Sequence, residues 1–255
     1  MASDALWGFS SSAIALSLTY PADTLSRYGQ VSAIAGKRFS LKSFTVKTAY
    51  KGLTPALATQ PLYWALYTPL YQKTKQGYLL GDMVAGFGCG AVATLTTNPL
   101  WVLRQRMQTE LLKDKNNTYR QLVRELYVES GINSFFRGAG ITLVKNVQMA
   151  LLLPMFDRLR KNQIWEGQSP FVAAVLSGAF AKIVSSTIVY PLDVIRTNIR
   201  YIEAPYVTVG SVTKQIYQRP GGMSNFFRGI GWYWIGSSLT FGIMMGIQSL
   251  TIKSL

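Results

Sequence analysis

Two lysines, Lys145 and Lys182, lie inside long stretches that otherwise carry no charge. In the middle of a membrane a charged side chain costs ~2.5 kcal/mol or more unless it faces water or a partner. Each lysine therefore indicates a binding site for an anionic group, and Gln148 adds an amide donor one turn from Lys145. The alternative is a structural lysine that donates to backbone carbonyls freed by a helix kink. This alternative weighs more for Lys182, which occupies a packing position among small residues.

The chain contains no histidine and a single cysteine, Cys89. These absences exclude general-base histidines, Ser-His-Asp triads, disulfides, and metal sites built from histidine or cysteine. We therefore expect a protein that is not an enzyme and that uses neither a metal nor a cofactor.

A short phrase with a central proline occurs three times, and a basic residue follows each copy within a few positions. Its copies are Tyr20-Pro21-Ala22-Asp23, Asn98-Pro99-Leu100-Trp101 and Tyr190-Pro191-Leu192-Asp193. A second mark recurs in step with it, as Tyr50-Lys51-Gly52, Phe136-Arg137-Gly138 and Phe227-Arg228-Gly229. Two marks that recur together indicate one structural unit used three times.

The elements that must position these residues are six stretches with almost no charge. They cover residues 5–22, 53–70, 83–103, 138–156, 167–192 and 229–252. Each is long enough to cross ~30 Å of hydrocarbon at ~1.5 Å per residue. The alternative, a soluble protein with buried core helices, is disfavoured by the number and length of the stretches. We expect an all-α membrane protein with six transmembrane helices in three two-helix modules, each with a short interfacial helix.

The expected modules are residues 1–75, 76–163 and 164–255. The three long connectors carry an excess of Lys and Arg, which places them on the cytoplasm-equivalent side and both termini on the other. The pattern predicts interfacial helices starting at Tyr119 and at Val209, whereas the first connector is less regular. The first apolar stretch is not expected to be a cleaved signal, since it begins with Asp4 rather than basic residues.

Proline near the end of each odd-numbered span kinks the helix and frees a backbone carbonyl. Kinks at Pro21, Pro99 and Pro191 are expected to bring the three odd helices together at one membrane face. Acidic and basic residues after the prolines then meet across the central axis.

In these motifs the chain resembles the mitochondrial carrier family over nearly its full length. The family motif is P-x-[DE]-x-x-[KR], often with Gln nine residues after Pro, followed by an aromatic-[KR]-Gly mark that opens the even helix. The resemblance implies transport by alternating access. It also implies a matrix-side gate at the proline motifs and a cytosolic-side gate on the even helices.

The resemblance further implies that each motif carboxylate pairs with the basic residue of the next repeat. Asp23 has Arg104 available, but Ser26 offers Asp193 no cation, and Trp101 offers no carboxylate. Arg27 stands next to Ser26 yet points about 100° away on a helix. The gate is therefore predicted to be weak. A weak gate indicates either a low barrier to switching between states or a loss of transport. The expected matrix-gate residues are Asp23, Arg104, Asp193, Arg196, Trp101 and Ser26, and the cytosolic-gate residues are Gln72, Lys75, Asp157, Arg160 and Gln248.

Family substrate contacts fall seven and eight residues past the glycine of each even helix. Gly236 at one of these positions removes an anchor and leaves room. Together with the residues found above, the expected contacts are Thr59, Gln60, Lys145, Asn146, Gln148, Lys182, Gly236 and Ser237.

Three features resemble the branch that carries flavin, folate, NAD, and pyrimidine or peroxisomal adenine nucleotides. They are Trp101, the segment Trp64-Ala65-Leu66-Tyr67, and the segment Gly178-Ala179-Phe180-Ala181-Lys182. In this interpretation Tyr63, Trp64 or Tyr67 stacks on a base or flavin ring. The alternative is that these aromatics face lipid or pack in the core.

The three aromatic-basic-Gly marks stand at helix N-termini, where backbone N–H groups bind anions. The resemblance implies cardiolipin at Lys51, Gly52, Arg137, Gly138, Arg228 and Gly229. Solvated interfacial cations are the alternative. The net charge of +15 is spread over loops on one side, where anionic lipid explains it better than nucleic acid does.

We therefore expect a monomeric antiporter for an anionic nucleotide-like solute of the nucleotide, NAD, FAD, folate or CoA type. The expected location is the mitochondrial inner membrane, with the peroxisomal membrane as the alternative. Two other functions stay open. One is a carrier-fold protein that no longer transports and acts as a receptor or insertion scaffold, and the other is a carboxylate carrier.

Overall fold

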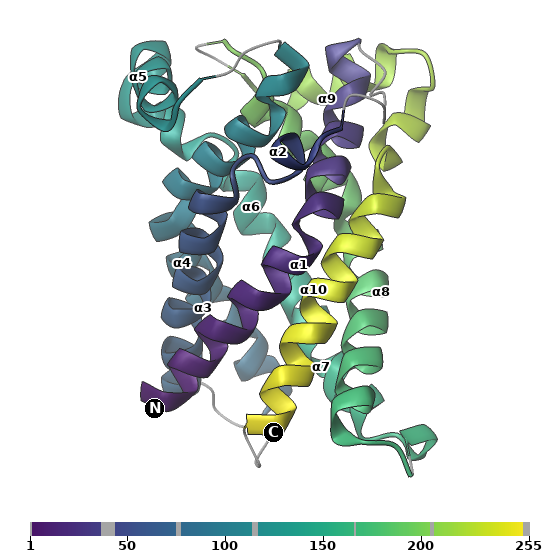
Figure 1. Ribbon diagram of the computed structural model, residues 1–255. Coiled ribbons are helices and arrows are strands. Elements are labelled where there is room, and N and C mark those ends of the chain that lie inside the picture. Colours follow the sequence, from purple (N-terminus) through teal and green to yellow (C-terminus); the bar gives the residue numbers. More distant parts are fainter. Residues whose placement is uncertain are drawn as a thin grey trace.

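The computed structural model describes residues 2–36, 44–74, 78–113, 117–165, 167–204 and 207–251, and over these ranges it contains helices and no strand. The all-α prediction therefore holds for the described chain. Long helices run beside one another, with both termini at one end and the short helices α2, α5 and α9 at the other (Figure 1). Their bounds are α1 Ala2–Ala35, α2 Val46–Ala49, α3 Leu53–Thr74, α4 Leu79–Thr109, α5 Tyr119–Ser130, α6 Ala139–Lys145, α7 Val147–Arg160, α8 Pro170–Tyr201, α9 Val209–Gln218 and α10 Ile230–Thr251.

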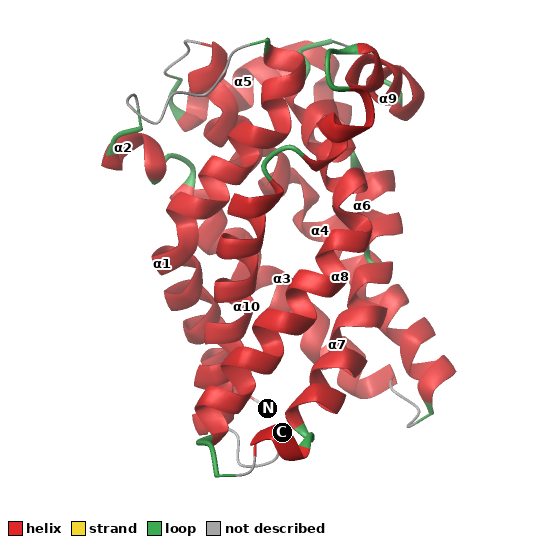
Figure 2. Cartoon of the chain, turned by 90° about the vertical axis from the view of Figure 1, so that its right-hand side faces the viewer, coloured by secondary structure: helices red, strands yellow, loops and turns green. Residues whose placement is uncertain are grey.

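The short helices begin where the sequence predicts them. Thr118 and Gln121 form a capping box that starts α5, and the side chain of Thr208 accepts the N–H of Ser211 at 3.2 Å at the start of α9. In the irregular first connector, α2 has only four residues. Figure 2 shows α2, α5 and α9 at the same end of the long helices.

The motif prolines lie inside helices that continue well past them, so Pro21, Pro99 and Pro191 do not end α1, α4 and α8. The side chain before each proline donates a hydrogen bond to a backbone carbonyl at or next to the second mark of the same unit. Tyr20 Oη donates to the carbonyl of Lys51 at 3.2 Å, and Tyr190 Oη donates to that of Arg228 at 2.8 Å. Between them in the chain, Asn98 Nδ2 donates to the carbonyl of Phe135 at 2.8 Å.

The glycines of the second marks pack on the neighbouring odd helix. Gly52, Gly138 and Gly229 have φ values of 85°, 70° and 81°, where a side chain is strained. A Cβ on Gly52 would lie 3.1 Å from the carbonyl oxygen of Arg104 in α4, and one on Gly229 would lie 2.8 Å from that of Ser26 in α1. A Cβ on Gly138 would lie 3.2 Å from Cγ of Arg196 in α8. The contacts thus run from each unit to the next.

The fourth apolar stretch differs from the expected single helix, because it divides into α6 and α7 at Asn146. The N–H of Asn146 approaches the carbonyls of both Thr142 and Leu143, at 3.1 and 3.0 Å, which tightens the turn at this point. Its side chain exchanges hydrogen bonds with Thr94 of α4. Lys145 therefore stands at a joint between two helices.

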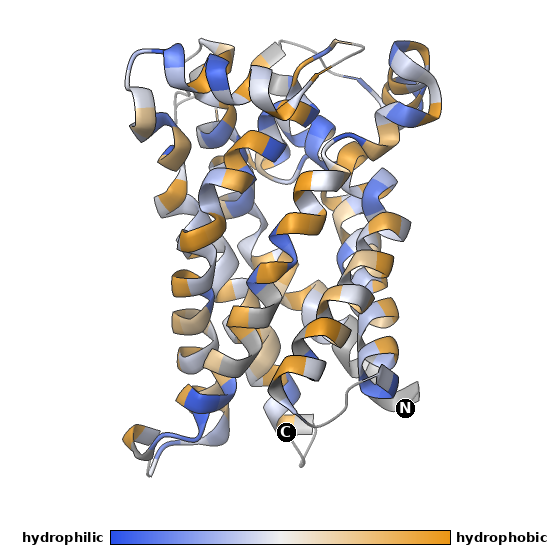
Figure 3. Ribbon diagram, turned by 180° about the vertical axis from the view of Figure 1, so that it is seen from behind, coloured by the Kyte–Doolittle hydropathy of each residue, from blue (hydrophilic) through white to orange (hydrophobic). Residues whose placement is uncertain are grey.

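Apolar side chains are exposed along the outer faces of the long helices. Hydrophobic colouring runs along much of their length, and hydrophilic colouring is frequent in the segments at the two ends (Figure 3). By length and composition one described helix, α8, is long and apolar enough to cross a membrane. Exposed apolar residues include Ile14 and Leu18 of α1, Leu80, Val84, Phe87 and Val92 of α4, Leu176, Phe180 and Ile188 of α8, and Trp232, Ile235 and Leu239 of α10.

Candidate functional site

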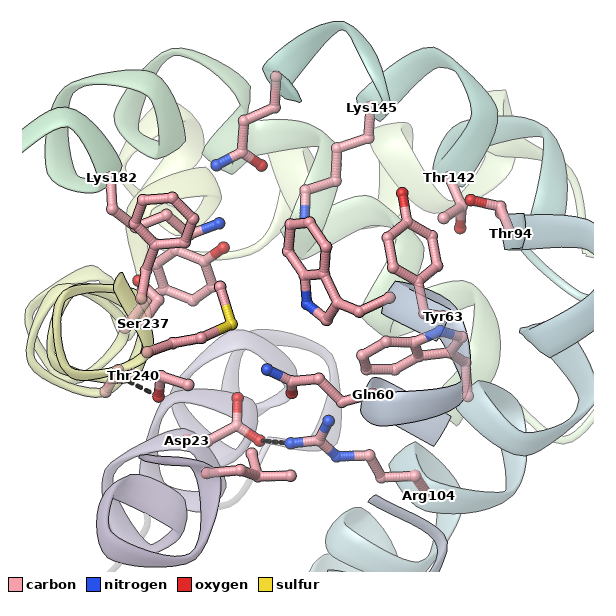
Figure 4. Close-up of a pocket in the computed structure, with 18 of the residues that line it drawn as sticks. Asp23, Gln60, Tyr63, Thr94, Arg104, Thr142, Lys145, Lys182, Ser237 and Thr240 are labelled. Carbon is pink, nitrogen blue, oxygen red and sulfur yellow. Dashed lines mark hydrogen bonds and ion pairs between the residues drawn. The ribbon is translucent and has the colours of Figure 1, made fainter. Parts of the chain in front are cut away.

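A cavity of about 200 Å³ lies among the long helices. Figure 4 shows Lys145 and Lys182 on one side of it, and Asp23, Arg104 and Gln60 on the other. Its lining residues are Leu16, Asp23, Arg27, Gln60, Tyr63, Trp64, Thr94, Trp101, Arg104, Thr142, Lys145, Asn146, Gln148, Lys182, Arg196, Tyr233, Gly236, Ser237, Thr240, Phe241 and Met244.

The lining carries an excess of positive charge. One carboxylate, that of Asp23, faces it. A second carboxylate, that of Asp193, is buried behind Lys145. Within a low-dielectric cavity this imbalance favours an anionic occupant. The cationic lining residues are Arg27, Arg104, Lys145, Lys182 and Arg196.

Asp23 in α1 pairs with Arg104 in α4, with 2.8 Å between Oδ2 and Nη2. Gln108 donates to the same oxygen at 2.9 Å, and Arg27 approaches the other oxygen at 3.3 Å from one turn along α1. Trp101 replaces a motif carboxylate and still contacts a cation, since the Arg104 guanidinium lies 5.1 Å from its ring centroid. The pair predicted between the first two motifs is therefore formed and braced.

Asp193 does not lack a cation, which corrects the expectation drawn from Ser26. Its Oδ1 lies 2.7 Å from Nζ of Lys145 in α6 and 2.6 Å from Nη2 of Arg196, one turn along α8. Arg27 does not take this role, because it pairs with Asp23 and donates to Gln30 at 3.1 Å. An even helix thus supplies the charge that the motif of α1 omits.

Hydrogen bonds join the odd helices where ion pairs are missing. Gln105 of α4 donates to the carbonyl of Thr197 in α8 at 2.9 Å. Thr197 Oγ1 and Asn198 Nδ2 donate to the side chain and carbonyl of Gln30 in α1, at 2.7 and 2.9 Å. Arg200 of α8 donates to Asn98 of α4 at 2.8 Å. We call the end of the long helices that carries the proline motifs the motif end. The prediction of a weak gate there was based on counting ion pairs, and it did not include these hydrogen bonds.

The opposite end of the long helices has a different character. Gln72 and Asp157 are exposed, and Arg160 and Gln248 are half-buried, whereas Lys75 lies outside the described residues. Within the described chain Asp157 and Arg160 form no ion pair, unlike Asp23 and Asp193 at the motif end.

The predicted substrate contacts gather in the cavity with one exception. Gln60, Lys145, Asn146, Gln148, Lys182, Gly236 and Ser237 line it, and Thr59 does not. Thr59 is fully buried and its hydroxyl donates to the carbonyl of Pro55 in its own helix. Because consecutive helical residues point about 100° apart, only Gln60 of this pair faces the cavity.

Four polar atoms of lining residues have no hydrogen-bond partner among the described residues: Nε2 of Gln148, Oγ of Ser237, and Nε of Arg104 and of Arg196. Gln148 is 3% exposed, so its free donor is costly unless an occupant accepts it. Lys182 forms no ion pair with a described residue and lies 5.9 Å from the ring centroid of Phe241. These groups are available to an anion.

Gly236 does not leave the room that was expected for a substrate. A Cβ there would lie 3.1 Å from the backbone nitrogen of Asp23 and 3.3 Å from Ala22. The glycine therefore allows α10 to approach α1 closely.

Only two of the three predicted stacking aromatics line the cavity, Tyr63 and Trp64. Tyr67 is buried between Tyr63 and Tyr71, with ring centroids 5.9 and 5.6 Å away. Its hydroxyl would be 3.3 Å from a Cβ on Gly86 of α4. For Tyr67 the packing alternative is therefore correct.

Several lining residues were not predicted. On α10, Tyr233, Thr240, Phe241 and Met244 share one face with Ser237. Their spacing of three and four residues on a single helical face is a pattern that would have found them. Thr94 and Thr142 carry no comparable pattern.

The basic residues of the second marks differ in their surroundings. Lys51 pairs with Glu110 at 2.9 Å. Arg137 pairs with Glu129 at 2.8 Å and donates to the carbonyl of Ala204 at 2.7 Å, so its guanidinium is occupied by protein. Arg228 is exposed and makes no ion pair within the described chain. Lipid binding at these marks stays a prediction.

The family model described as mitochondrial carrier protein matches residues 76–165 and 167–255. Among curated relatives, nicotinamide adenine dinucleotide transporter 1 (chloroplastic) of Arabidopsis thaliana is 26% identical over 71% of this chain and 64% of its own length. Nicotinamide adenine dinucleotide transporter 2 (mitochondrial) of Arabidopsis thaliana is 26% identical over 90% of this chain and 73% of its own length. The peroxisomal nicotinamide adenine dinucleotide carrier of Arabidopsis thaliana is 27% identical over 94% of this chain and 92% of its own length.

Proposed function

Because the chain belongs to the mitochondrial carrier family, we propose that it transports an anionic nucleotide-like solute across an organelle membrane by alternating access. The observation that carries this proposal is the charge of the cavity. Five cationic side chains and one carboxylate line it, and polar groups such as Gln148 Nε2 lack partners.

We propose the membrane architecture of six spans in three modules. The exposed apolar side chains on α1, α4, α8 and α10 support it, since in water they would present a large unfavourable surface. The contacts that recur in each unit, from the residue before proline and from the glycine of the second mark, support the threefold arrangement.

In this proposal the structure represents the state closed at the motif end. Bonds between α1 and α4, α4 and α8, and α8 and α1 support closure there. At the other end, Asp157 and Arg160 form no ion pair within the described residues. Alternation would break the bonds at the motif end. It would form new contacts at the opposite end among Asp157, Arg160, Gln72, Lys75 and Gln248.

The solute class follows from the chemistry of the lining. Lys145 and Lys182 provide the charge that phosphate groups need. Trp64 and Tyr63 provide flat rings for a base. The relatives named as nicotinamide adenine dinucleotide carriers make NAD the first solute to test. Ligand sites commonly measure ~300–1,000 Å³, so a cavity of about 200 Å³ must widen to hold a dinucleotide.

The names of these relatives place them in chloroplast, mitochondrion and peroxisome. For this chain we propose the mitochondrial inner membrane, with the peroxisomal membrane as the alternative. Exchange of solutes by a monomer remains part of the proposal.

The test is uptake by purified protein in liposomes preloaded with unlabelled solute. Labelled NAD, adenine and pyrimidine nucleotides, and carboxylates are supplied outside. We expect uptake of a nucleotide-type solute and a strong reduction in the Lys182→Gln variant. Uptake of carboxylates alone would contradict the solute class. No uptake of any solute by protein with helical circular dichroism would favour the receptor or scaffold function instead.

A further inference from the structure

Lys145 forms an ion pair within the protein. Its Nζ lies 2.7 Å from Oδ1 of Asp193, and the two side chains are 14% and 0% exposed. Lys145 lines the cavity, whereas Asp193 lies behind it. The cation expected to bind an anionic solute is therefore bound to an internal carboxylate, and the bond joins α6 to α8.

The carboxylate of Asp193 retains a second cation if Lys145 leaves. Arg196 donates to the same oxygen at 2.6 Å. A buried carboxylate with no partner would be strongly unfavourable, and Arg196 removes that obstacle. No basic side chain of the first motif replaces Lys145, because the corresponding residue is Ser26, which is fully buried.

Lys145 also lies at the joint between α6 and α7, where a movement of its side chain can change how the two helices are oriented. It is the last residue of α6, and the chain turns at Asn146 before α7 begins. The equivalent helices α3 and α10 are each continuous. Just past the joint, the unpaired Nε2 of Gln148 provides a donor for an anion that draws Lys145 toward the cavity.

We propose that Lys145 is a latch released by the solute: in the empty protein it ties α6 to α8 through Asp193, and an anionic group in the cavity competes with Asp193 for it. The proposal rests on the function proposed above. The diphosphate bridge of a dinucleotide carries two negative charges and several acceptor oxygens, against one charge and two oxygens for a carboxylate, so it takes Lys145 while Asp193 keeps Arg196. Solute binding then removes one of the contacts that close the motif end.

The first experiment needs no solute. Thermal unfolding is measured for the wild type, Lys145→Gln, Asp193→Asn and the double variant. We expect strong non-additivity, because each single change already breaks the bond. The matched control is Lys182→Gln combined with Asp193→Asn, since Lys182 lines the same cavity without an ion pair to a described residue. Equal coupling in both cycles would overturn the specific bond.

The second experiment measures binding of NAD by calorimetry. A solute that competes with Asp193 binds several-fold more tightly to Asp193→Asn and more weakly to Lys145→Gln, and Asp193→Asn has no tightening effect in the Lys145→Gln background. If Asp193→Asn fails to fold, Ser26→Lys serves instead. It supplies the basic residue of the family motif and should also tighten binding by freeing Lys145. Unchanged or weaker binding in the variant used would show a purely structural ion pair and overturn the latch.

Inorganic pyrophosphate is the second probe, because it carries the anionic group without a base. If NAD is neither bound nor transported while pyrophosphate binds more tightly to Asp193→Asn, the proposed solute is wrong and the latch stands. If neither probe binds the wild-type protein, the latch is overturned.

Discussion

Arg200 and Asn98 are joined by a hydrogen bond of 2.8 Å between Nη2 of the arginine and Oδ1 of the asparagine. Arg200 is 1% exposed and has no carboxylate partner among the described residues. Its guanidinium donates instead to neutral oxygens, including Gln105 Oε1 at 3.2 Å and the carbonyl of Arg137 at 3.1 Å. It stands at the motif position where Gln30 and Gln108 occur in the other units, and it joins α8 to α4.

This relationship predicts that Arg200 is required for stability. Arg200→Ala leaves several buried acceptors unpaired and should lower the free energy of unfolding by about 2–4 kcal/mol. Arg200→Gln, which restores the family residue, should lower it by less than Arg200→Ala. Chemical or thermal unfolding in detergent measures both. Equal losses in the two variants would contradict this prediction, because the amide of Gln should replace at least one of the lost donors.

A second prediction concerns the pair of Asp23 and Arg104. Asp23→Asn removes the negative charge that balances the buried Arg104 cation. Breaking a buried ion pair in this way lowers the free energy of unfolding by about 3–5 kcal/mol. We expect a clear fall in the unfolding temperature and loss of controlled exchange in liposomes.

The exposed Asp157 provides the control, because Asp157→Asn should change stability by less than about 0.5 kcal/mol. Exchanging the charges, with Asp23→Arg and Arg104→Asp together, should recover part of the lost stability. Indistinguishable stability of Asp23→Asn and Asp157→Asn would contradict the role given to the pair.

A third prediction follows from the close approach of α10 to α1. In Gly236→Ala the new Cβ lies 3.1 Å from the backbone nitrogen of Asp23, and such overpacking typically costs about 1–3 kcal/mol. Gly231→Ala, in the same helix with nothing within 4 Å of the new Cβ, should be neutral or slightly stabilising. Thermal unfolding of both variants tests the difference, and a destabilised Gly231→Ala with an unaffected Gly236→Ala would reverse the assignment.

A fourth prediction separates the two aromatic roles on α3. If Trp64 stacks on a base, Trp64→Ala should weaken NAD binding by about 1–3 kcal/mol while leaving pyrophosphate binding nearly unchanged. Tyr67→Phe is the control, since Tyr67 does not line the cavity. Equal weakening of both ligands in Trp64→Ala would point to a general packing effect.

The local pattern of the chain predicted its helices well. Long apolar stretches and capping residues such as Thr118 determine helix formation through contacts within a few residues. The division at Asn146 could not be predicted, because it accompanies a bond to Thr94 of another helix. Likewise Thr59 and Tyr67 carry plausible chemistry, but only packing against their neighbours shows that they face away from the cavity.

Residue type and spacing by themselves determined the all-α class, the family motifs and most of the charges near the cavity, Arg27 being the exception. Tertiary structure decided which charges meet. Position 26 holds a serine where Asp193 needs a cation, and the fold brings Lys145 there from α6, with its Nζ 2.7 Å from Oδ1 of Asp193. The motif assigns Asp193 a partner at position 26, whereas a buried carboxylate takes whichever cation the packed helices bring within reach.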